Sequence, residues 1–76
     1  MEKNDFLTSF QEQFEDTDAS EINFETVYKD LPEWNSMMAL VIIAFVDESY
    51  DVTVTGADLQ NTHTVEELYN IVLSKK

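Results

Sequence analysis

The chain has 76 residues and no cysteine, and its 16 Asp and Glu against four Lys and Arg give a net charge of −12. This length suits one small domain, placed at residues 1–76, and the lack of cysteine excludes a disulfide or a thiolate metal site. The charge repels a nucleic-acid backbone and an anionic membrane surface, so we expect neither as a partner. We expect a monomer whose partners carry basic patches.

The N-terminal segment is expected to form a first helix from Asp5 to Glu15, with Asn4 or Asp5 as its cap. No apolar signal core follows Met1, so we expect a cytoplasmic protein. The apolar residues of this segment recur at helical spacing and are expected to face the core: Phe6, Leu7, Phe10 and Phe14.

Residues 16–35 are expected to form a long loop. Their apolar residues follow neither a helical nor a strand period, and Pro32 prevents easy continuation of a helix. Because long structureless loops are uncommon unless they pack, we expect this one to lay its apolar side chains over the helices. A calcium loop is disfavoured, since the acidic stretch lacks the required glycine and has Val27 where a bidentate glutamate is needed.

A second helix is predicted from Ser36 to Tyr50. Its first part is a run of hydrophobic residues from Met37 to Val46, which is too short to cross a bilayer as a helix. A strand is also conceivable for this run, but it is long for a strand and has no obvious pairing partner. We therefore expect a buried helix and no membrane span.

The C-terminal third predicts a short connector over residues 52–54 and two further helices. Thr55 and Asp58 have the spacing of a capping box and open a short third helix that runs through Asn61. Thr64 and Glu67 repeat this signal and open the last helix, whose stripe extends to Val72. Residues expected in the core across the chain are Phe6, Phe10, Phe14, Ile42, Val46, Val54, Leu59, Leu68 and Val72.

These elements predict an all-α fold, a small four-helix bundle with a long first loop and a short third helix. His63 is the only histidine and is expected in the turn between the last two helices. With no cysteine, it provides neither a zinc site nor a Cys/His catalytic pair. The sequence therefore indicates no catalytic residue and no metal ligand.

Ser36 is the candidate functional residue. It begins the second helix, where backbone N–H groups lack intrahelical partners and the helix dipole is positive, an arrangement that suits a phosphate. The alternative is that Ser36 is only an N-cap, the commonest role of a serine at a helix start. The segment that contains it reads Asp30-Leu31-Pro32-Glu33-Trp34-Asn35-Ser36-Met37.

This segment and the helix order resemble the acyl carrier protein family, whose signature is Asp-Ser-Leu, preceded in many stand-alone members by Leu-Pro-x-Trp. The resemblance extends from Phe6 to Val72. Further matching segments are Asp47-Glu48-Ser49-Tyr50, Val52-Thr53-Val54 and Thr64-Val65-Glu66-Glu67-Leu68.

The resemblance implies that Ser36 receives 4′-phosphopantetheine from coenzyme A through a phosphopantetheinyl transferase. The chain would then hold acyl groups as thioesters for fatty-acid, polyketide or related biosynthesis, without being an enzyme itself. Its other partners would be an acyl-loading ligase, a ketosynthase or an acyltransferase with basic docking patches. Interior residues of such carriers part to shelter an acyl chain.

The resemblance also places partner docking on the second helix and the loop before it. Asp47 and Glu48 keep the acidic character expected there, and Trp34 is either a recognition residue or a loop anchor. Met38 and Val41 stand at two outward positions that are usually acidic, which predicts more apolar contact, weaker salt dependence and a dedicated partner set.

The signature itself departs at two positions. Asn35 replaces the usual aspartate and keeps its capping ability but loses its charge, which predicts slower modification or a particular transferase. Met37 replaces leucine at similar volume. Two alternatives stay open: an acidic helical interaction module that keeps the carrier fold without the prosthetic group, and a peptidyl or aminoacyl carrier protein.

Overall fold

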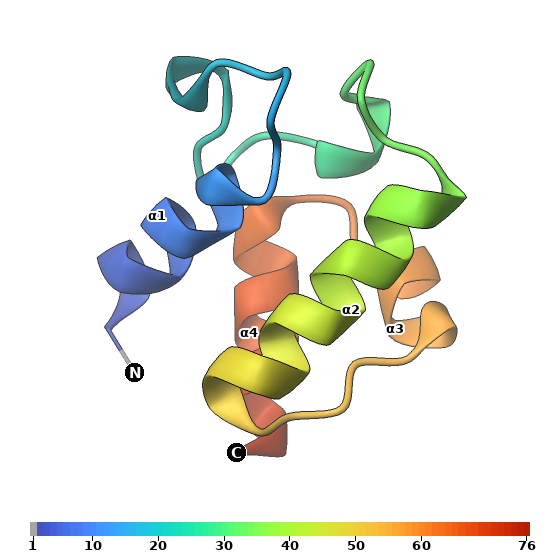
Figure 1. Cartoon of the computed structure of the whole chain (residues 1–76). Coiled ribbons are helices and arrows are strands. Elements are labelled where there is room, and N and C mark those ends of the chain that lie inside the picture. The colour runs from blue at the N-terminus through green and yellow to red at the C-terminus, as the bar shows by residue number, and fades with distance from the viewer. Residues whose placement is uncertain (1) are drawn as a thin grey trace.

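The computed structural model describes residues 2–76 and consists of four α-helices (Figure 1). They are α1 (Lys3–Glu12), α2 (Ser36–Tyr50), α3 (Gly56–Asn61) and α4 (Val65–Lys75). Residues 2–76 contain no strand, only an isolated antiparallel bridge between Val27 and Thr64. The expected all-α fold of four helices is thereby confirmed.

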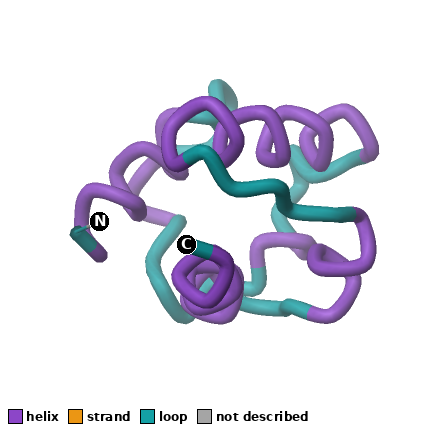
Figure 2. The backbone as a smooth tube through the Cα atoms, turned by 90° about the horizontal axis from the view of Figure 1, so that it is seen from below, coloured by secondary structure: helices purple, strands orange, loops and turns teal. Residues whose placement is uncertain are grey.

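The longest helix, α2, lies across α4, while α1 and α3 flank the pair on opposite sides (Figure 1). In the view from below, α4 is seen end-on beneath α2 (Figure 2). None of the helices in residues 2–76 is both long enough and apolar enough to cross a membrane.

Helix α2 has the predicted bounds because both of its ends are capped. Asn35 accepts a hydrogen bond from the Met38 amide at the N-terminus. At the C-terminus, Asp51 adopts the left-handed conformation with φ 57°, and its amide donates to the Asp47 carbonyl over 2.9 Å. The Lys76 ammonium donates to the Tyr50 carbonyl, which places a positive charge at the negative end of the helix dipole.

The core between the helices is rich in aromatic rings. Phe6 on α1 is fully buried, and its ring centroid lies 5.3 Å from that of Tyr69 and 6.0 Å from that of Phe45. Such tilted pairs add to the burial of apolar area. All nine residues expected in the core from the sequence are buried, and Leu7 packs against them half-buried.

Helix α1 departs from its predicted bounds. It begins at Lys3 and ends at Glu12, and the residue at its N-cap is Glu2, which makes no side-chain capping bond. The predicted cap at Asn4 or Asp5 and the predicted end at Glu15 were therefore wrong. Phe14 still reaches the core after the helix has ended, which explains why the apolar period continues past Glu12.

The loop from α1 to α2 is pinned to the start of α4, as expected for a loop that packs. It contains two 3₁₀ turns, η1 (Ala19–Glu21) and η2 (Tyr28–Asp30). The amides of Val65 and Glu66, which lack intrahelical partners, donate to the carbonyls of Thr26 and Phe24 over 3.1 and 3.0 Å. The loop thus completes the N-terminus of α4.

Both predicted capping boxes are present. Thr55 accepts from the Asp58 amide and Asp58 accepts from the Thr55 amide at the start of α3, and Thr64 and Glu67 repeat this exchange at α4. His63 lies in the predicted turn between α3 and α4.

Candidate functional site

Ser36 lies at the junction between the long loop and α2. It is the first residue of the helix, and the preceding residue, Asn35, has an extended backbone with φ −160° and ψ −175°. The Asn35 side chain accepts from the Met38 amide over 2.8 Å, and its carbonyl accepts from the Ala39 amide over 3.0 Å. The capping residue of α2 is therefore Asn35, and the alternative that Ser36 is the cap was wrong.

The Ser36 side chain is exposed to solvent. Within residues 2–76 its hydroxyl makes no hydrogen bond. The amides of Ser36 and Met37, the first two of α2, have no carbonyl available four residues earlier in the helix, and the first turn contains no acidic residue. The positive end of the dipole therefore acts on this position without a carboxylate in the same turn.

Trp34 anchors the loop two residues before Ser36. The indole is half-buried; its ring centroid lies 5.1 Å from that of Tyr28 in an edge-on arrangement and 6.5 Å from that of Phe14. Tyr28 is itself fixed, because its hydroxyl lies 2.7 Å from the hydroxyl of buried Thr62. These contacts favour the loop-anchor interpretation of Trp34.

Glu33 fixes the same loop from the other side. Its carboxylate accepts from the amides of Glu15 and Asp16 over 3.1 Å each and from the Thr17 hydroxyl over 2.8 Å. This carboxylate joins the segment after α1 to the segment before α2. The backbone that presents Ser36 is therefore held by both an aromatic stack and a hydrogen-bonded carboxylate.

A groove opens beside Ser36, between the end of α1 and the first turns of α2. Its volume is about 490 Å³. Four carboxylates stand on the side of α1 and the loop, and three apolar side chains stand on the side of α2. Its lining residues are Glu12, Gln13, Glu15, Asp16, Glu33, Asn35, Met37, Met38 and Val41.

The expectation that Met38 faces outward was wrong. Met38 is only 8% exposed and belongs to the core, whereas Val41 is half-buried. Met38 lies four residues before Ile42, so both share the inner face of the helix, together with Phe45. The unbroken apolar run from Met37 to Val46 conceals the helical period, so the sequence alone did not assign Met38 to the inner face.

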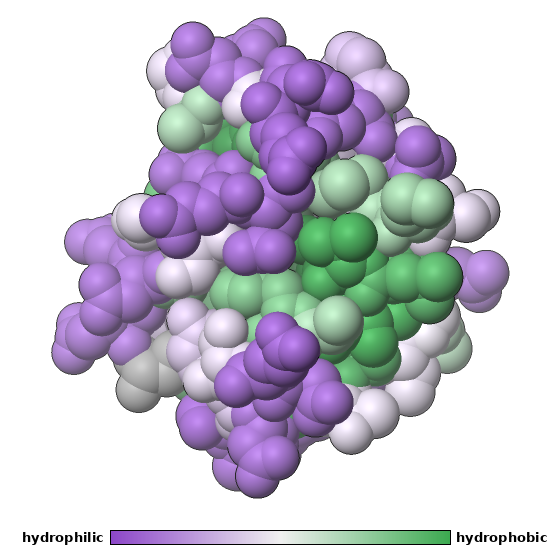
Figure 3. Space-filling model, viewed as in Figure 1, coloured by the Kyte–Doolittle hydropathy of each residue, from purple (hydrophilic) through white to green (hydrophobic). Residues whose placement is uncertain are grey.

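The large apolar side chains that α2 exposes are Met37 and Leu40. They are 72% and 66% exposed. Sequence reasoning placed Met37 only in the motif that flanks Ser36 and missed Leu40. Figure 3 shows apolar surface over α2 with hydrophilic surface around it. This apolar strip consists of Met37, Leu40, Val41 and Ala44.

Asp47 and Glu48 are exposed, but the helix does not bring them to Ser36. They lie in the last turns of α2, about 17–18 Å along the helix axis from the first residue. Asn35, Ser36 and Met37 thus form one cluster at the N-terminus, and Asp47 and Glu48 form an acidic end at the other.

Within residues 2–76, the Ser36 hydroxyl is hydrogen-bonded to no side chain that could accept its proton. In the described part of the chain, no group of three or more histidine and acidic side chains is placed to hold a metal ion. The pKa of Glu67 is lowered by hydrogen bonds from the amides of His63 and Thr64, so this carboxylate is engaged in capping α4. The arrangement offers an accessible hydroxyl without a hydrogen-bonded base to activate it as a nucleophile.

No protein-family model matches this chain, and neither the curated proteins nor the solved structures contain a significant match to it.

Proposed function

We propose that this chain is a stand-alone acyl carrier protein that carries 4′-phosphopantetheine on Ser36. The observation that supports this most directly is the exposed Ser36 hydroxyl at the first position of α2, free of hydrogen bonds within residues 2–76. The resemblance of the surrounding segment to the family signature, and a helical fold with a long first loop and a short third helix, are consistent with it.

The residues at this position fit a phosphodiester. The free amides of the first turn of α2 and the helix dipole favour a negative group there, and the first turn has no acidic residue to oppose it. Asn35 keeps the helix start capped without adding charge next to the phosphate. When attached, the group supplies a terminal thiol on which an acyl chain is held as a thioester.

Attachment requires Ser36 as the nucleophile. Its oxygen forms a bond to the phosphorus next to the pantetheine of coenzyme A, the bond from that phosphorus to the adenosine bisphosphate breaks, and the hydroxyl proton passes to a base. The transferase would provide this base and its magnesium, since within residues 2–76 no base is hydrogen-bonded to the Ser36 hydroxyl and no cluster of side chains is placed to hold a metal ion. The contacts of Trp34 and Glu33 hold the loop that leads to Ser36.

Partner enzymes of this carrier would dock along α2. The docking surface consists of the exposed apolar strip that includes Met37, Leu40 and Val41, with Asp47 and Glu48 at its acidic end. This surface suits a transferase, an acyl-loading ligase, a ketosynthase or an acyltransferase whose basic residues surround an apolar contact. We also propose that this carrier acts in the cytoplasm.

The direct test is the intact mass of the protein after incubation with coenzyme A, magnesium and a broad-specificity phosphopantetheinyl transferase. Ser49, exposed on the same helix, provides a matched control. We expect the wild type and Ser49→Ala to gain one phosphopantetheine and Ser36→Ala to gain none. Equal gain by Ser36→Ala would place the attachment elsewhere and contradict the proposal.

Asn35 bears on the rate of this reaction. Because the amide lacks the charge that a basic residue of the transferase could pair with, Asn35→Asp should be modified faster than the wild type. Failure of both proteins with transferases from the native host would favour the acidic interaction module without a prosthetic group. A cognate ligase that adenylates amino acids would indicate an aminoacyl or peptidyl carrier.

A further inference from the structure

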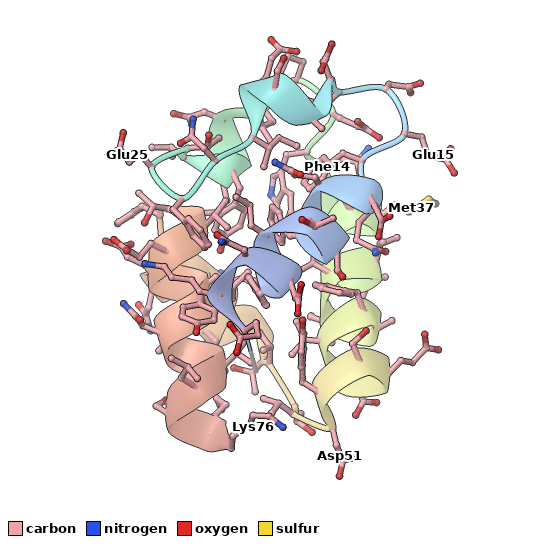
Figure 4. The ribbon with its side chains drawn as sticks, turned by 90° about the vertical axis from the view of Figure 1, so that its left-hand side faces the viewer. Phe14, Glu15, Glu25, Met37, Asp51 and Lys76 are labelled. Carbon is pink, nitrogen blue, oxygen red and sulfur yellow. The ribbon has the colours of Figure 1, made fainter. Side chains whose placement is uncertain are left out.

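The groove beside Ser36 has two chemically different walls. One wall, from the end of α1 and the following loop, carries the carboxylates of Glu12, Glu15 and Asp16, with Glu33 at its edge. The other wall, from α2, carries Met37, Met38 and Val41. Figure 4 shows Glu15 and Met37 projecting from the same side of the molecule, with Phe14 nearer its middle.

The accessible part of the apolar wall is Met37, with Val41 half-buried beside it. Met37 is 72% exposed, and Leu40 continues the apolar surface along α2. Methionine side chains are flexible and polarizable, so they adjust to apolar groups of different shape. An exposed apolar surface with a polar rim is typical of a site of protein contact.

The acidic wall has carboxylates free to pair. Glu33 is engaged by the amides of Glu15 and Asp16 and by Thr17. In residues 2–76, the carboxylates of Glu12, Glu15 and Asp16 form no salt bridge, because the two that occur there join Lys3 to Glu66 and Lys75 to Asp58. A basic group in the groove would therefore meet three carboxylates without displacing an existing cation.

We propose that this groove binds a basic amphipathic segment of a partner protein. An apolar side chain of that segment packs on Met37 and Val41, while flanking Lys or Arg side chains pair with Glu12, Glu15 and Asp16. Charge complementarity favours this occupant. A second copy of the chain is a poorer fit, because each copy carries a net charge of −12. The proposal does not require a modified Ser36.

The test uses the unmodified full chain and a synthetic helical peptide of about 14 residues that has a leucine face and a lysine face. A peptide of the same composition, scrambled to remove the leucine face, measures purely electrostatic binding. Binding is followed by backbone amide shifts in nuclear magnetic resonance spectra. We expect the amphipathic peptide to bind at least about tenfold more tightly than the scrambled peptide, with shifts concentrated at the groove.

Two matched pairs of variants measure the contributions of the apolar wall and the acidic wall to peptide binding separately. Met37→Ser should weaken binding about tenfold, whereas Leu73→Ser, at an exposed apolar position on α4, should leave it unchanged. Glu15→Gln should weaken binding and reduce its salt dependence more than Glu25→Gln, which lies on the opposite side of the molecule (Figure 4). The spectra of the free variants report directly whether each remains folded.

Three outcomes would overturn the proposal. One is equal binding of the amphipathic and scrambled peptides, and another is an unchanged affinity in Met37→Ser. The third is self-association of the free protein through the groove, measured by sedimentation velocity, since a second copy would then be the occupant. Because the assay contains no coenzyme A or transferase, its failure leaves the attachment at Ser36 unaffected, and failure of that attachment leaves the groove unaffected.

Discussion

The side chain of Asn35 accepts a hydrogen bond of 2.8 Å from the backbone amide of Met38 and so caps α2, whose first residue is Ser36. The amide oxygen of Asn35 performs the capping that an aspartate would perform, without the charge. A substitution of Asn35 can therefore change the charge that a transferase would meet while leaving the helix cap in place.

Asn35→Ala removes the cap and should lower the free energy of unfolding by about 1 kcal/mol. Asn35→Asp keeps the hydrogen bond and should stay within about 0.5 kcal/mol of the wild type, since the gain from the helix dipole is opposed by the negative charge of the protein. Urea unfolding followed by circular dichroism measures both. No loss of stability in Asn35→Ala would show that the cap does not stabilise α2.

The buried hydroxyl of Tyr28 links the long loop to the end of α3. It lies 2.7 Å from the Thr62 hydroxyl and 3.3 Å from the Leu59 carbonyl. Tyr28→Phe should lower the free energy of unfolding by about 1–2 kcal/mol, because it removes a hydrogen bond from a buried polar pair. The control is Tyr50→Phe, a half-buried tyrosine whose hydroxyl makes no hydrogen bond within residues 2–76. A loss no greater than that of the control would argue against the link.

The same tyrosine makes stability depend on alkaline pH. Burial raises the pKa of Tyr28 above its usual value of 10.0, against a smaller lowering by the Thr62 hydrogen bond. The unfolded chain therefore loses this proton first, and stability falls as the pH rises from about 10 toward the pKa of the folded state. Tyr28→Phe should make this fall shallower, with the remainder due in part to Tyr50, whose pKa burial also raises. Unfolding curves at successive pH values measure the slope.

Gly56 opens α3 although its backbone needs no glycine. Its φ is not positive, and a Cβ built on it has no neighbouring atom within 4 Å. Gly56→Ala should therefore raise the free energy of unfolding by about 0.4–1 kcal/mol, mainly because the unfolded chain becomes less flexible. Thermal unfolding measures the gain. A lower melting temperature would mean that α3 requires the freedom of a glycine.

Glu67 should contribute a pH-dependent part of the stability of α4. Hydrogen bonds from the amides of His63 and Thr64 lower its pKa below the usual 4.5. Its stabilising effect is complete above that usual value and is lost as the pH falls through the lower pKa of the folded state. The advantage of the wild type over Glu67→Gln should therefore shrink under acidic conditions. Urea titrations of the two proteins at successive pH values measure this difference, and a difference that stays constant with pH would contradict the prediction.

Local signals in the sequence predicted most of the helix boundaries. Helix α2 has the bounds expected from its apolar run and the following acidic residues, and the two capping boxes open α3 and α4 at the expected threonines. These features depend on residues within four positions of each other, so the sequence displays them directly. Helix α1 lacks a side-chain cap, and its bounds were accordingly misplaced.

Contacts between distant segments could not be predicted in this way. The amides of Val65 and Glu66 are satisfied by loop carbonyls about 40 positions earlier, and no side chain identifies those carbonyls. The groove similarly depends on how the end of α1 approaches α2. Ser36 was identified from its local segment, whereas the exposure of Leu40 and the burial of Met38 required the packing of α2 on its neighbours.

The position of Trp34 gives the molecule an intrinsic optical reporter. It is the only tryptophan in the chain, it stands two residues before Ser36, and its ring rests against Tyr28 and Phe14. Its fluorescence emission therefore depends on whether the loop before α2 is seated on the aromatic core. Loosening of that loop, by a substitution or by a bound partner, becomes visible without any attached dye.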